Sequence, residues 1–155
     1  MNKEIERKFL VKRVPNGVMK ETIIHQTYLA IGDEEIRIRK KISDEAETHT
    51  LTIKKGAGLV REELETKITN ETYEQLRVSS SSFPLIKKRK VLNFHSNGNS
   101  YTAEIDLYQK FDFVTVEIEF PDEEAANAFK KPNWIGDEIT GYPRFQNQNL
   151  WRECQ

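Results

Sequence analysis

Hydrophobic and polar residues alternate along most of the chain, and this period of two is typical of β-strands whose two faces meet different surroundings. Turn-forming residues separate the alternating segments, as in Gly56-Ala57-Gly58 and Asn97-Gly98-Asn99. Most consecutive strands are therefore expected to pair antiparallel. The pattern predicts eight strands, at residues 3–11, 24–31, 35–43, 48–55, 59–68, 84–95, 100–109 and 113–120.

Two segments have a helical pattern in place of the alternation. One covers residues 70–79 with Asn70 as its N-cap, and the other covers residues 122–130 with Asp122 as its N-cap. Side chains of Asn and Asp favour this position because they accept hydrogen bonds from the free N–H groups at a helix start.

Two further regions have weaker patterns. A short helix is predicted between Pro15 and Ile23. From Pro132 onward the chain is predicted to be irregular and aromatic-rich, and to pack back on the body. Eight strands with helices inserted between them fit a closed antiparallel barrel. The predicted fold class is therefore mainly β (α+β), an eight-stranded closed barrel with a few helices outside.

Composition adds limits to this picture. The 155 residues match the size of one domain, 1–155. With 24 Lys+Arg against 25 Asp+Glu the net charge is −1, so no overall positive field attracts nucleic acid or a membrane surface. No apolar run approaches the length of a membrane span, and the single cysteine, Cys154, has no partner for an internal disulfide. A cytoplasmic protein is expected, either monomeric or homodimeric.

Charged residues occupy the polar face of seven of the eight predicted strands, and several of these faces carry one sign, such as Arg37/Arg39 and Glu117/Glu119. One interpretation is that these are solvated outer faces of a sandwich. The other is that acidic and basic strands face each other inside a wide barrel, because like charges on one side are costly without opposite charges across from them. The candidate inward residues are Glu4, Glu6, Glu63, Glu65, Glu104, Asp106, Glu117 and Glu119, against Lys8, Arg37, Arg39, Lys54, Arg61, Lys87 and Arg89.

A cavity with both signs of charge suits a particular chemistry. Lys and Arg bind phosphate oxygens, and Mg²⁺ or Mn²⁺ prefers carboxylate oxygens together with water and substrate phosphates. Both sets are needed for metal-assisted phosphoryl transfer, in which charge neutralisation and positioning provide most of the catalysis. The predicted ligand is therefore a metal-bound polyanion.

The N-terminal segment Glu4-Ile5-Glu6-Arg7-Lys8 has the pattern ExExK, and paired charges follow in order along the later strands. The later motifs are Arg37-Ile38-Arg39, Thr52-Ile53-Lys54, Arg61-Glu62-Glu63-Leu64-Glu65, Lys87-Lys88-Arg89, Glu104-Ile105-Asp106 and Glu117-Ile118-Glu119. This series resembles the CYTH superfamily, also called triphosphate tunnel metalloenzymes, over essentially the whole chain. The resemblance implies an eight-stranded tunnel that acts on triphosphates with Mg²⁺ or Mn²⁺.

The resemblance also implies roles for individual residues. Glu4, Glu6 and Glu119 would hold the metal, with Asp106 and Glu117 as further candidate ligands. The residues expected to bind phosphate oxygens are Lys8, Arg37, Arg39, Lys54, Lys87 and Arg89. Four acids could orient these cations, hold a second metal or position the attacking water: Glu63, Glu65, Asp106 and Glu117. Arg61 is either a phosphate ligand or an internal counter-ion.

Tyr28 is a candidate from register alone. Its hydroxyl is expected near Lys8, whose ammonium would favour a tyrosinate that accepts a proton from water. The alternative is a tyrosine that only hydrogen-bonds in the barrel wall. The candidate catalytic residues are Lys8, Tyr28, Glu63 and Glu65.

The leading functional hypothesis is metal-dependent hydrolysis of inorganic triphosphate, with nucleoside triphosphates left open as further substrates. The alternatives on the same fold are a class IV adenylate cyclase and a thiamine triphosphatase. The alternative that is not an enzyme is a module that binds polyphosphate or a nucleotide without turnover. Shared tunnel motifs bind phosphate and metal, so they do not separate these substrates.

Overall fold

The computed structural model describes residues 1–155 and contains nine strands, three α-helices and one short 3₁₀ helix. The strands are β1 (Asn2–Val11), β2 (Lys20–Ile31), β3 (Glu34–Ile42), β4 (Glu47–Lys55), β5 (Val60–Lys67), β6 (Leu85–Ser96), β7 (Asn99–Tyr108), β8 (Val114–Glu119) and β9 (Ile135–Glu138). The helices are α1 (Asn70–Ser80), α2 (Glu123–Ala128), η1 (Pro143–Phe145) and α3 (Asn147–Glu153).

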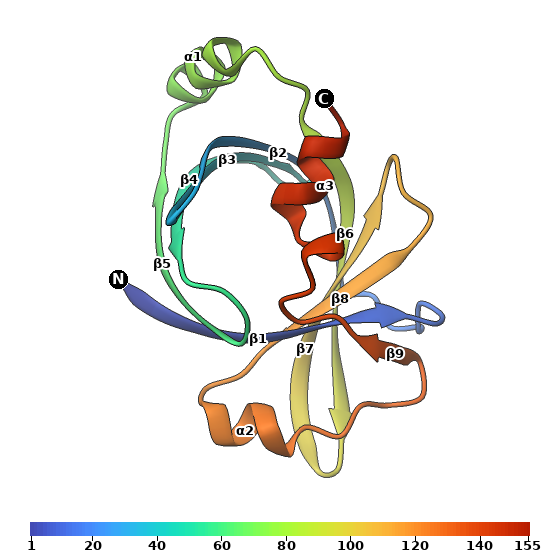
Figure 1. Ribbon diagram of the computed structural model, residues 1–155. Coiled ribbons are helices and arrows are strands. Elements are labelled where there is room, and N and C mark those ends of the chain that lie inside the picture. The colour runs from blue at the N-terminus through green and yellow to red at the C-terminus, as the bar shows by residue number, and fades with distance from the viewer.

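Strands β1 to β8 form a closed ring, as Figure 1 shows in a view into the ring. The order is β5-β4-β3-β2-β6-β7-β8-β1, every pairing is antiparallel, and β1 pairs again with β5 through Glu4 and Arg61. Strand β1 closes the ring because its first half pairs with β5 while residues from Glu6 to Leu10 pair with β8. The predicted fold class is confirmed.

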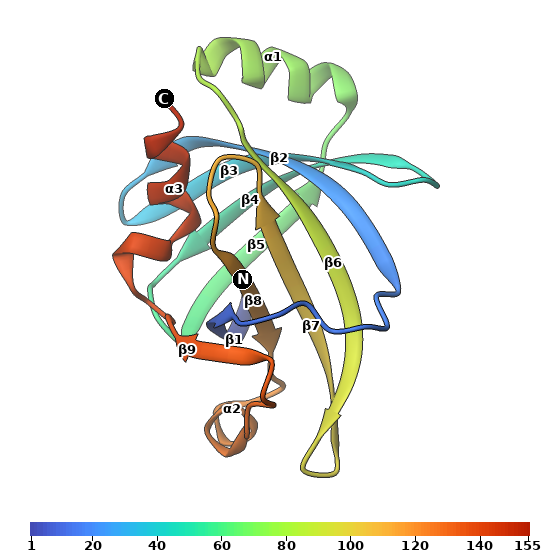
Figure 2. The same ribbon diagram turned by 90° about the vertical axis from the view of Figure 1, so that its right-hand side faces the viewer.

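The main hydrophobic core lies outside the ring. It is formed by the apolar face of β1, β7 and β8, where Phe9, Ile105 and Val116 are fully buried, and it is covered by α2 and the segment around Trp134. In Figures 1 and 2, α2 lies at the end of the molecule opposite α1. Because successive side chains of a strand point to opposite faces, an apolar outer face directs the charged residues of the same strands into the ring.

Helix α3 packs at the ring opening against β2 and β6 (Figure 1). A second small apolar cluster holds it there, formed by Leu85, Tyr108, Leu150 and Cys154. The prediction that the C-terminal part packs back on the body is confirmed, but the prediction that it is irregular is wrong. Strand β9 adds to β1, and η1 and α3 follow it.

The predicted short helix between Pro15 and Ile23 is wrong. Strand β2 begins at Lys20, earlier than predicted, and pairs with β6 from Lys20 onward, so its backbone groups hydrogen-bond to a neighbouring strand. Gly17 has a φ of +94°, which interrupts a right-handed helix.

The helix caps are partly as predicted. The Asp122 carboxylate accepts a hydrogen bond of 2.7 Å from the N–H of Ala125, which confirms this N-cap. The N-cap of α1 is Thr69, whose hydroxyl accepts from the N–H of Thr72, so the prediction of Asn70 is wrong by one residue. None of the helices is long and apolar enough to cross a membrane.

Candidate active site

A cavity of about 360 Å³ lies inside the ring and is lined by 28 residues, only four of them hydrophobic. Such a polar lining suits a charged ligand better than an apolar one. The interpretation of the charged faces as outer faces of a sandwich is therefore wrong. The predicted residues that line the cavity are Glu4, Glu6, Lys8, Tyr28, Arg37, Arg39, Lys54, Arg61, Glu63, Glu65, Arg89, Glu104, Glu117 and Glu119.

Acidic and basic strands face each other in this cavity, as the sequence predicts. Lys54 Nζ lies 3.0 Å from Glu4 Oε1 and 3.7 Å from Glu63 Oε2, because β4 is the neighbour of β5 in the ring and β5 of β1. Lys8 Nζ lies 3.9 Å from Glu117 Oε1, across the β1–β8 pair. Burial opposes ionisation of Glu117, but Lys8 and Arg89 hold the pKa of this carboxyl well below its usual range.

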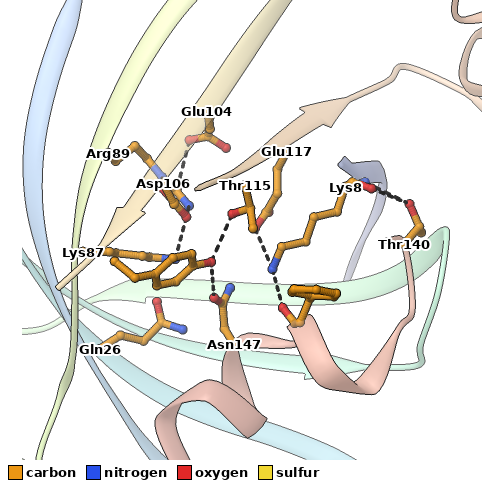
Figure 3. Close-up of polar contacts among 12 residues, drawn as sticks. Lys8, Gln26, Lys87, Arg89, Glu104, Asp106, Thr115, Glu117, Thr140 and Asn147 are labelled. Carbon is orange, nitrogen blue, oxygen red and sulfur yellow. Dashed lines mark hydrogen bonds and ion pairs between the residues drawn. The ribbon is translucent and has the colours of Figure 1, made fainter. Parts of the chain in front are cut away.

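Two predicted site residues, Lys87 and Asp106, lie behind the lining (Figure 3). Asp106 accepts two hydrogen bonds from Arg89, of 2.8 and 2.9 Å, and its Oδ2 lies 2.8 Å from Lys87 Nζ. Despite complete burial, Arg89 and Lys87 lower the pKa of Asp106. Glu104 adds an ion pair of 3.0 Å to the same Arg89. Both oxygens of Asp106 are thus engaged by cations, and this carboxylate fixes the guanidinium of Arg89.

Arg39 differs from the other predicted cations of the ring because it forms no ion pair. Its side chain is buried, and its Nε donates a hydrogen bond of 2.7 Å to the neutral amide of Gln26. Burial, Arg37 and Arg89 lower the pKa of Arg39 to about 10. Lys41, which also lines the cavity without an ion pair, has its pKa lowered by burial and then by Arg39 and Arg89. The part of the cavity wall around Arg39 and Lys41 therefore carries more positive than negative charge.

The acidic residues of β1 form the opposite electrostatic environment. Burial raises the pKa of Glu6 well above its usual range, and the nearby Glu117 raises it further. Burial also opposes ionisation of Glu4, but a hydrogen bond between the two carboxyl groups and the charge of Lys54 lower its pKa overall. Burial and Glu4 raise the pKa of Glu119, which lies opposite Glu6 across the β1–β8 pair.

These carboxyl groups can accept a divalent cation. No three His, Cys, Asp or Glu side chains of the protein converge closely enough to hold a metal on their own. Mg²⁺ is usually held by one or two carboxylates together with water and substrate phosphates. Glu4 and Glu6 fit this requirement, because two adjacent, partly buried carboxyls favour a shared proton or a cation between them.

The expected contact between Tyr28 and Lys8 is wrong. Strand β2 lies between β3 and β6 in the ring and does not neighbour β1. Lys8 Nζ instead donates a hydrogen bond of 2.8 Å to the carbonyl of Phe145, and Tyr28 packs against Trp151 with ring centroids 5.6 Å apart and the ring planes tilted by 55°. Burial, followed by the charge of Glu35, raises the pKa of Tyr28, so the phenol keeps its proton at neutral pH.

Sequence reasoning missed Glu35, which lies on the inward face of β3. Its carboxylate lies 3.7 Å from Arg37 Nη1 and 3.5 Å from Arg61 Nη2, and its side chain is buried. Its position two residues before Arg37 was an available signal, because residues i and i+2 of a strand share a face. Arg61 thus has an internal counter-ion.

The C-terminal segment also contributes lining residues that the sequence did not indicate. These are Ile139, Thr140, Gly141, Phe145, Gln146, Asn147 and Gln148. All seven are uncharged, so the charge pattern could not identify them. The Thr140 hydroxyl accepts a hydrogen bond of 2.9 Å from the N–H of Lys8, which connects this segment to β1 (Figure 3).

Comparisons with known proteins agree with the polyanion-binding geometry of the cavity. No family model matches the chain. It is 32% identical over 152 residues to an inorganic triphosphatase of Nitrosomonas europaea, with 95% of each chain covered. It is 34% identical over 157 residues to an inorganic triphosphatase of Acetivibrio thermocellus, with 97% of this chain and 94% of the relative covered.

Solved structures with a similar fold agree with the result of the sequence comparison. The crystal structure of an inorganic triphosphatase superposes with a TM-score of 0.68 at 30% identity and covers 97% of this chain and 95% of its own. A protein from Hippeastrum, described as a candidate adenylyl cyclase with a dominant triphosphatase activity, shares the fold with a TM-score of 0.57 at 16% identity, over 80% of this chain and 82% of its own. Because identity of about a third extends over nearly the full length of the curated relatives, this chain belongs to the family of the inorganic triphosphatases.

Proposed function

We propose that the protein hydrolyses inorganic triphosphate in the cavity of its strand ring, as a CYTH-type triphosphate tunnel enzyme. The observation that carries the proposal is Arg39, a buried guanidinium without a carboxylate partner, with Lys41 beside it. A buried unpaired charge is costly, and a bound polyanion removes that cost. The names of the relatives, which are inorganic triphosphatases, support the same substrate.

Several cations of the ring are proposed to bind the phosphate oxygens. Arg37, Arg39 and Arg89 can each present a planar fork of donors, and Asp106 holds Arg89 in position. Lys8 and Lys54 supply point charges beside the acids of β1 and β8. Lys87 is buried behind the lining and is proposed to act on the substrate only by its charge, which is partial at neutral pH because burial lowers its pKa to about 7.

Glu4 and Glu6 are the proposed ligands of Mg²⁺ or Mn²⁺, with Glu119 and Glu117 beside them. When bound, such a cation neutralises charge that develops on the phosphates during phosphoryl transfer. Asp106 is proposed to position Arg89, because both of its oxygens already contact cations.

Glu63 and Glu65 on β5 are the proposed groups that orient the attacking water. Both line the cavity, and Glu65 accepts a hydrogen bond of 3.0 Å from the Thr52 hydroxyl, which holds its carboxylate in place. Lys54 Nζ is 3.7 Å from Glu63. Carboxylates held beside a polyphosphate can position water for in-line attack.

The sparse apolar lining favours inorganic triphosphate over substrates with a large ring. A purine or a thiamine ring needs an apolar or aromatic slot, and only four of the 28 lining residues are hydrophobic. We also propose a cytoplasmic location, which fits the single buried thiol of Cys154.

The test incubates purified protein with Mg²⁺ or Mn²⁺ and, separately, tripolyphosphate, ATP and thiamine triphosphate, and measures orthophosphate, pyrophosphate and cyclic AMP. We expect release of orthophosphate mainly from tripolyphosphate, and loss of this activity with EDTA. Cyclic AMP with pyrophosphate would instead identify a cyclase, dominant turnover of thiamine triphosphate would identify the other hydrolase, and binding without product would indicate a non-catalytic module.

A matched pair of variants tests the metal ligands. Glu6→Gln should lower kcat by about 100-fold or more, the scale of losing one electrostatic contact in a transition state. Glu71→Gln is the same chemical change on an exposed residue of α1 and should leave the rate unchanged. A rate for Glu6→Gln close to that of the wild type would show that the metal is held elsewhere.

A further inference from the structure

Gln26 is a fully buried polar residue that joins two groups of the cavity wall. Its Oε1 accepts a hydrogen bond of 2.7 Å from Arg39 Nε, and its Nε2 donates a hydrogen bond of 2.6 Å to the Tyr28 hydroxyl oxygen. Arg39 and Tyr28 line the cavity, whereas Gln26 does not. Gln26 therefore acts on a ligand only through these two neighbours.

The chemistry of the partners determines which way the Gln26 amide points. A guanidinium has donors only, so the group that faces Arg39 has to be the amide oxygen. The NH₂ group consequently faces Tyr28, and the phenol oxygen is the acceptor in this contact. The amide orientation is thus fixed by the network and does not depend on an arbitrary choice between O and N.

The hydroxyl proton of Tyr28 has no acceptor within the protein. This hydroxyl accepts a hydrogen bond from Gln26, and the guanidinium of Arg37, which also contacts the phenol oxygen, is a donor with no lone pair to offer. The O–H bond is therefore free to point into the cavity, where phosphate oxygens are strong acceptors.

We infer that Gln26 is a positioning residue which makes Tyr28 a hydrogen-bond donor to a phosphate oxygen of the bound substrate. The inference rests on the proposed triphosphatase function. Tyr28 and Arg39 then contact the polyphosphate from the same side. Gln26 holds both side chains in position through its two hydrogen bonds. A donor that is aimed in advance at developing negative charge stabilises the transition state more than the ground state.

The variant Gln26→Glu tests this directly because it reverses one hydrogen bond and keeps the other. A carboxylate beside Arg39 stays ionised and accepts only, so Tyr28 has to donate to the introduced carboxylate and turns its proton away from the cavity. We expect kcat for tripolyphosphate to fall about 10- to 100-fold, the range for a hydrogen bond to a charged group. The kcat of Tyr28→Phe should fall by a similar factor.

The double variant separates this effect from the added negative charge. In the Tyr28→Phe background, the loss of kcat caused by Gln26→Glu should be about 10-fold smaller than in the wild-type background, because only the new charge beside Arg39 still acts and no hydroxyl is left to redirect. Gln75→Glu, the same substitution on the exposed face of α1, controls for the change in net charge. Equal losses in both backgrounds would overturn the inference, and so would full activity of Tyr28→Phe.

A second substitution distinguishes positioning from a merely structural role. Gln26→Met removes both hydrogen bonds but leaves the Tyr28 proton free to reach the substrate, so it should lower kcat less than Gln26→Glu. A structural role predicts the reverse order, since Met removes more contacts, and that order would refute the inference. A wild-type protein that releases no phosphate from tripolyphosphate would refute the proposed function itself.

Discussion

Asp106 provides a prediction about stability that is independent of catalysis. Its carboxylate is fully buried and contacts two buried cations, with Lys87 Nζ at 2.8 Å and Arg89 Nε and Nη2 at 2.8 and 2.9 Å. Asp106→Asn keeps the shape of the side chain and one acceptor oxygen but removes the charge. Arg89 then keeps its ion pair with Glu104, while Lys87, whose pKa burial already lowers to about 7, loses its nearest counter-charge.

The expected loss follows from the cost of leaving a buried charge unpaired. Breaking a buried ion pair from one side costs about 3–5 kcal/mol, and the retained oxygen places this variant near about 3 kcal/mol. For a chain of this size, about 1 kcal/mol shifts Tm by about 2–4 °C, so about 3 kcal/mol corresponds to about 6–12 °C. Glu104→Gln, which removes a charge from the same Arg89 but on a side chain 39% exposed, should lower Tm much less.

Thermal unfolding of the three proteins at pH 7 measures these shifts. Since the cations lower the pKa of Asp106, its stabilising effect is present above the unfolded pKa of about 4 and is lost as the pH falls from there through the lower folded pKa. An equal Tm for wild type and Asp106→Asn at pH 7 would refute the reasoning.

Three further predictions concern other parts of the molecule. Arg39→Met should abolish tight binding of tripolyphosphate in calorimetry while the free energy of unfolding stays within about 1 kcal/mol, because the variant removes a buried charge that has no ion pair; a large loss of stability would contradict this. The pKa of Tyr28 is raised, so the tyrosinate absorbance that distinguishes wild type from Tyr28→Phe should appear only above about pH 10, the ordinary value for a tyrosine; a signal at about pH 8 would restore the idea of a general base. Thr69→Ala should cost about 1 kcal/mol in denaturant unfolding and Asn70→Ala less than about 0.5 kcal/mol, since Thr69 is the N-cap of α1.

The strand pattern was predictable because the period of two is strong in every strand of the ring. The errors lie where the local signal is weak. Strand β9 has only four residues and depends on β1 for its hydrogen bonds, and the short α3 depends on an apolar cluster with Leu85 and Tyr108. Residues 20–23 were predicted to be part of a short helix, but in the structure they begin β2 and pair with β6, and this pairing outweighs a local helical preference.

In the candidate site, too, some features were predictable from the sequence and others were not. The residues that face inward followed from alternation, and those predicted acids and bases line the cavity or, for Lys87 and Asp106, lie directly behind it. Their partners did not follow from it. The sequence predicts a contact between Tyr28 and Lys8, but Lys8 contacts the carbonyl of Phe145 while Tyr28 contacts Gln26.

The sequence by itself determined which side chains share a face, and hence that opposite charges balance inside the ring, because alternation is a local property of an extended backbone. Only the tertiary structure decided which charges form ion pairs and which cations, such as Arg39, have no acidic partner. Ion pairs depend on the order of strands around the ring and on the C-terminal segment, both of which join residues far apart in the chain. That order pairs Lys54 with Glu4 and leaves Arg39 with a neutral amide. The near-zero net charge therefore conceals a cationic site.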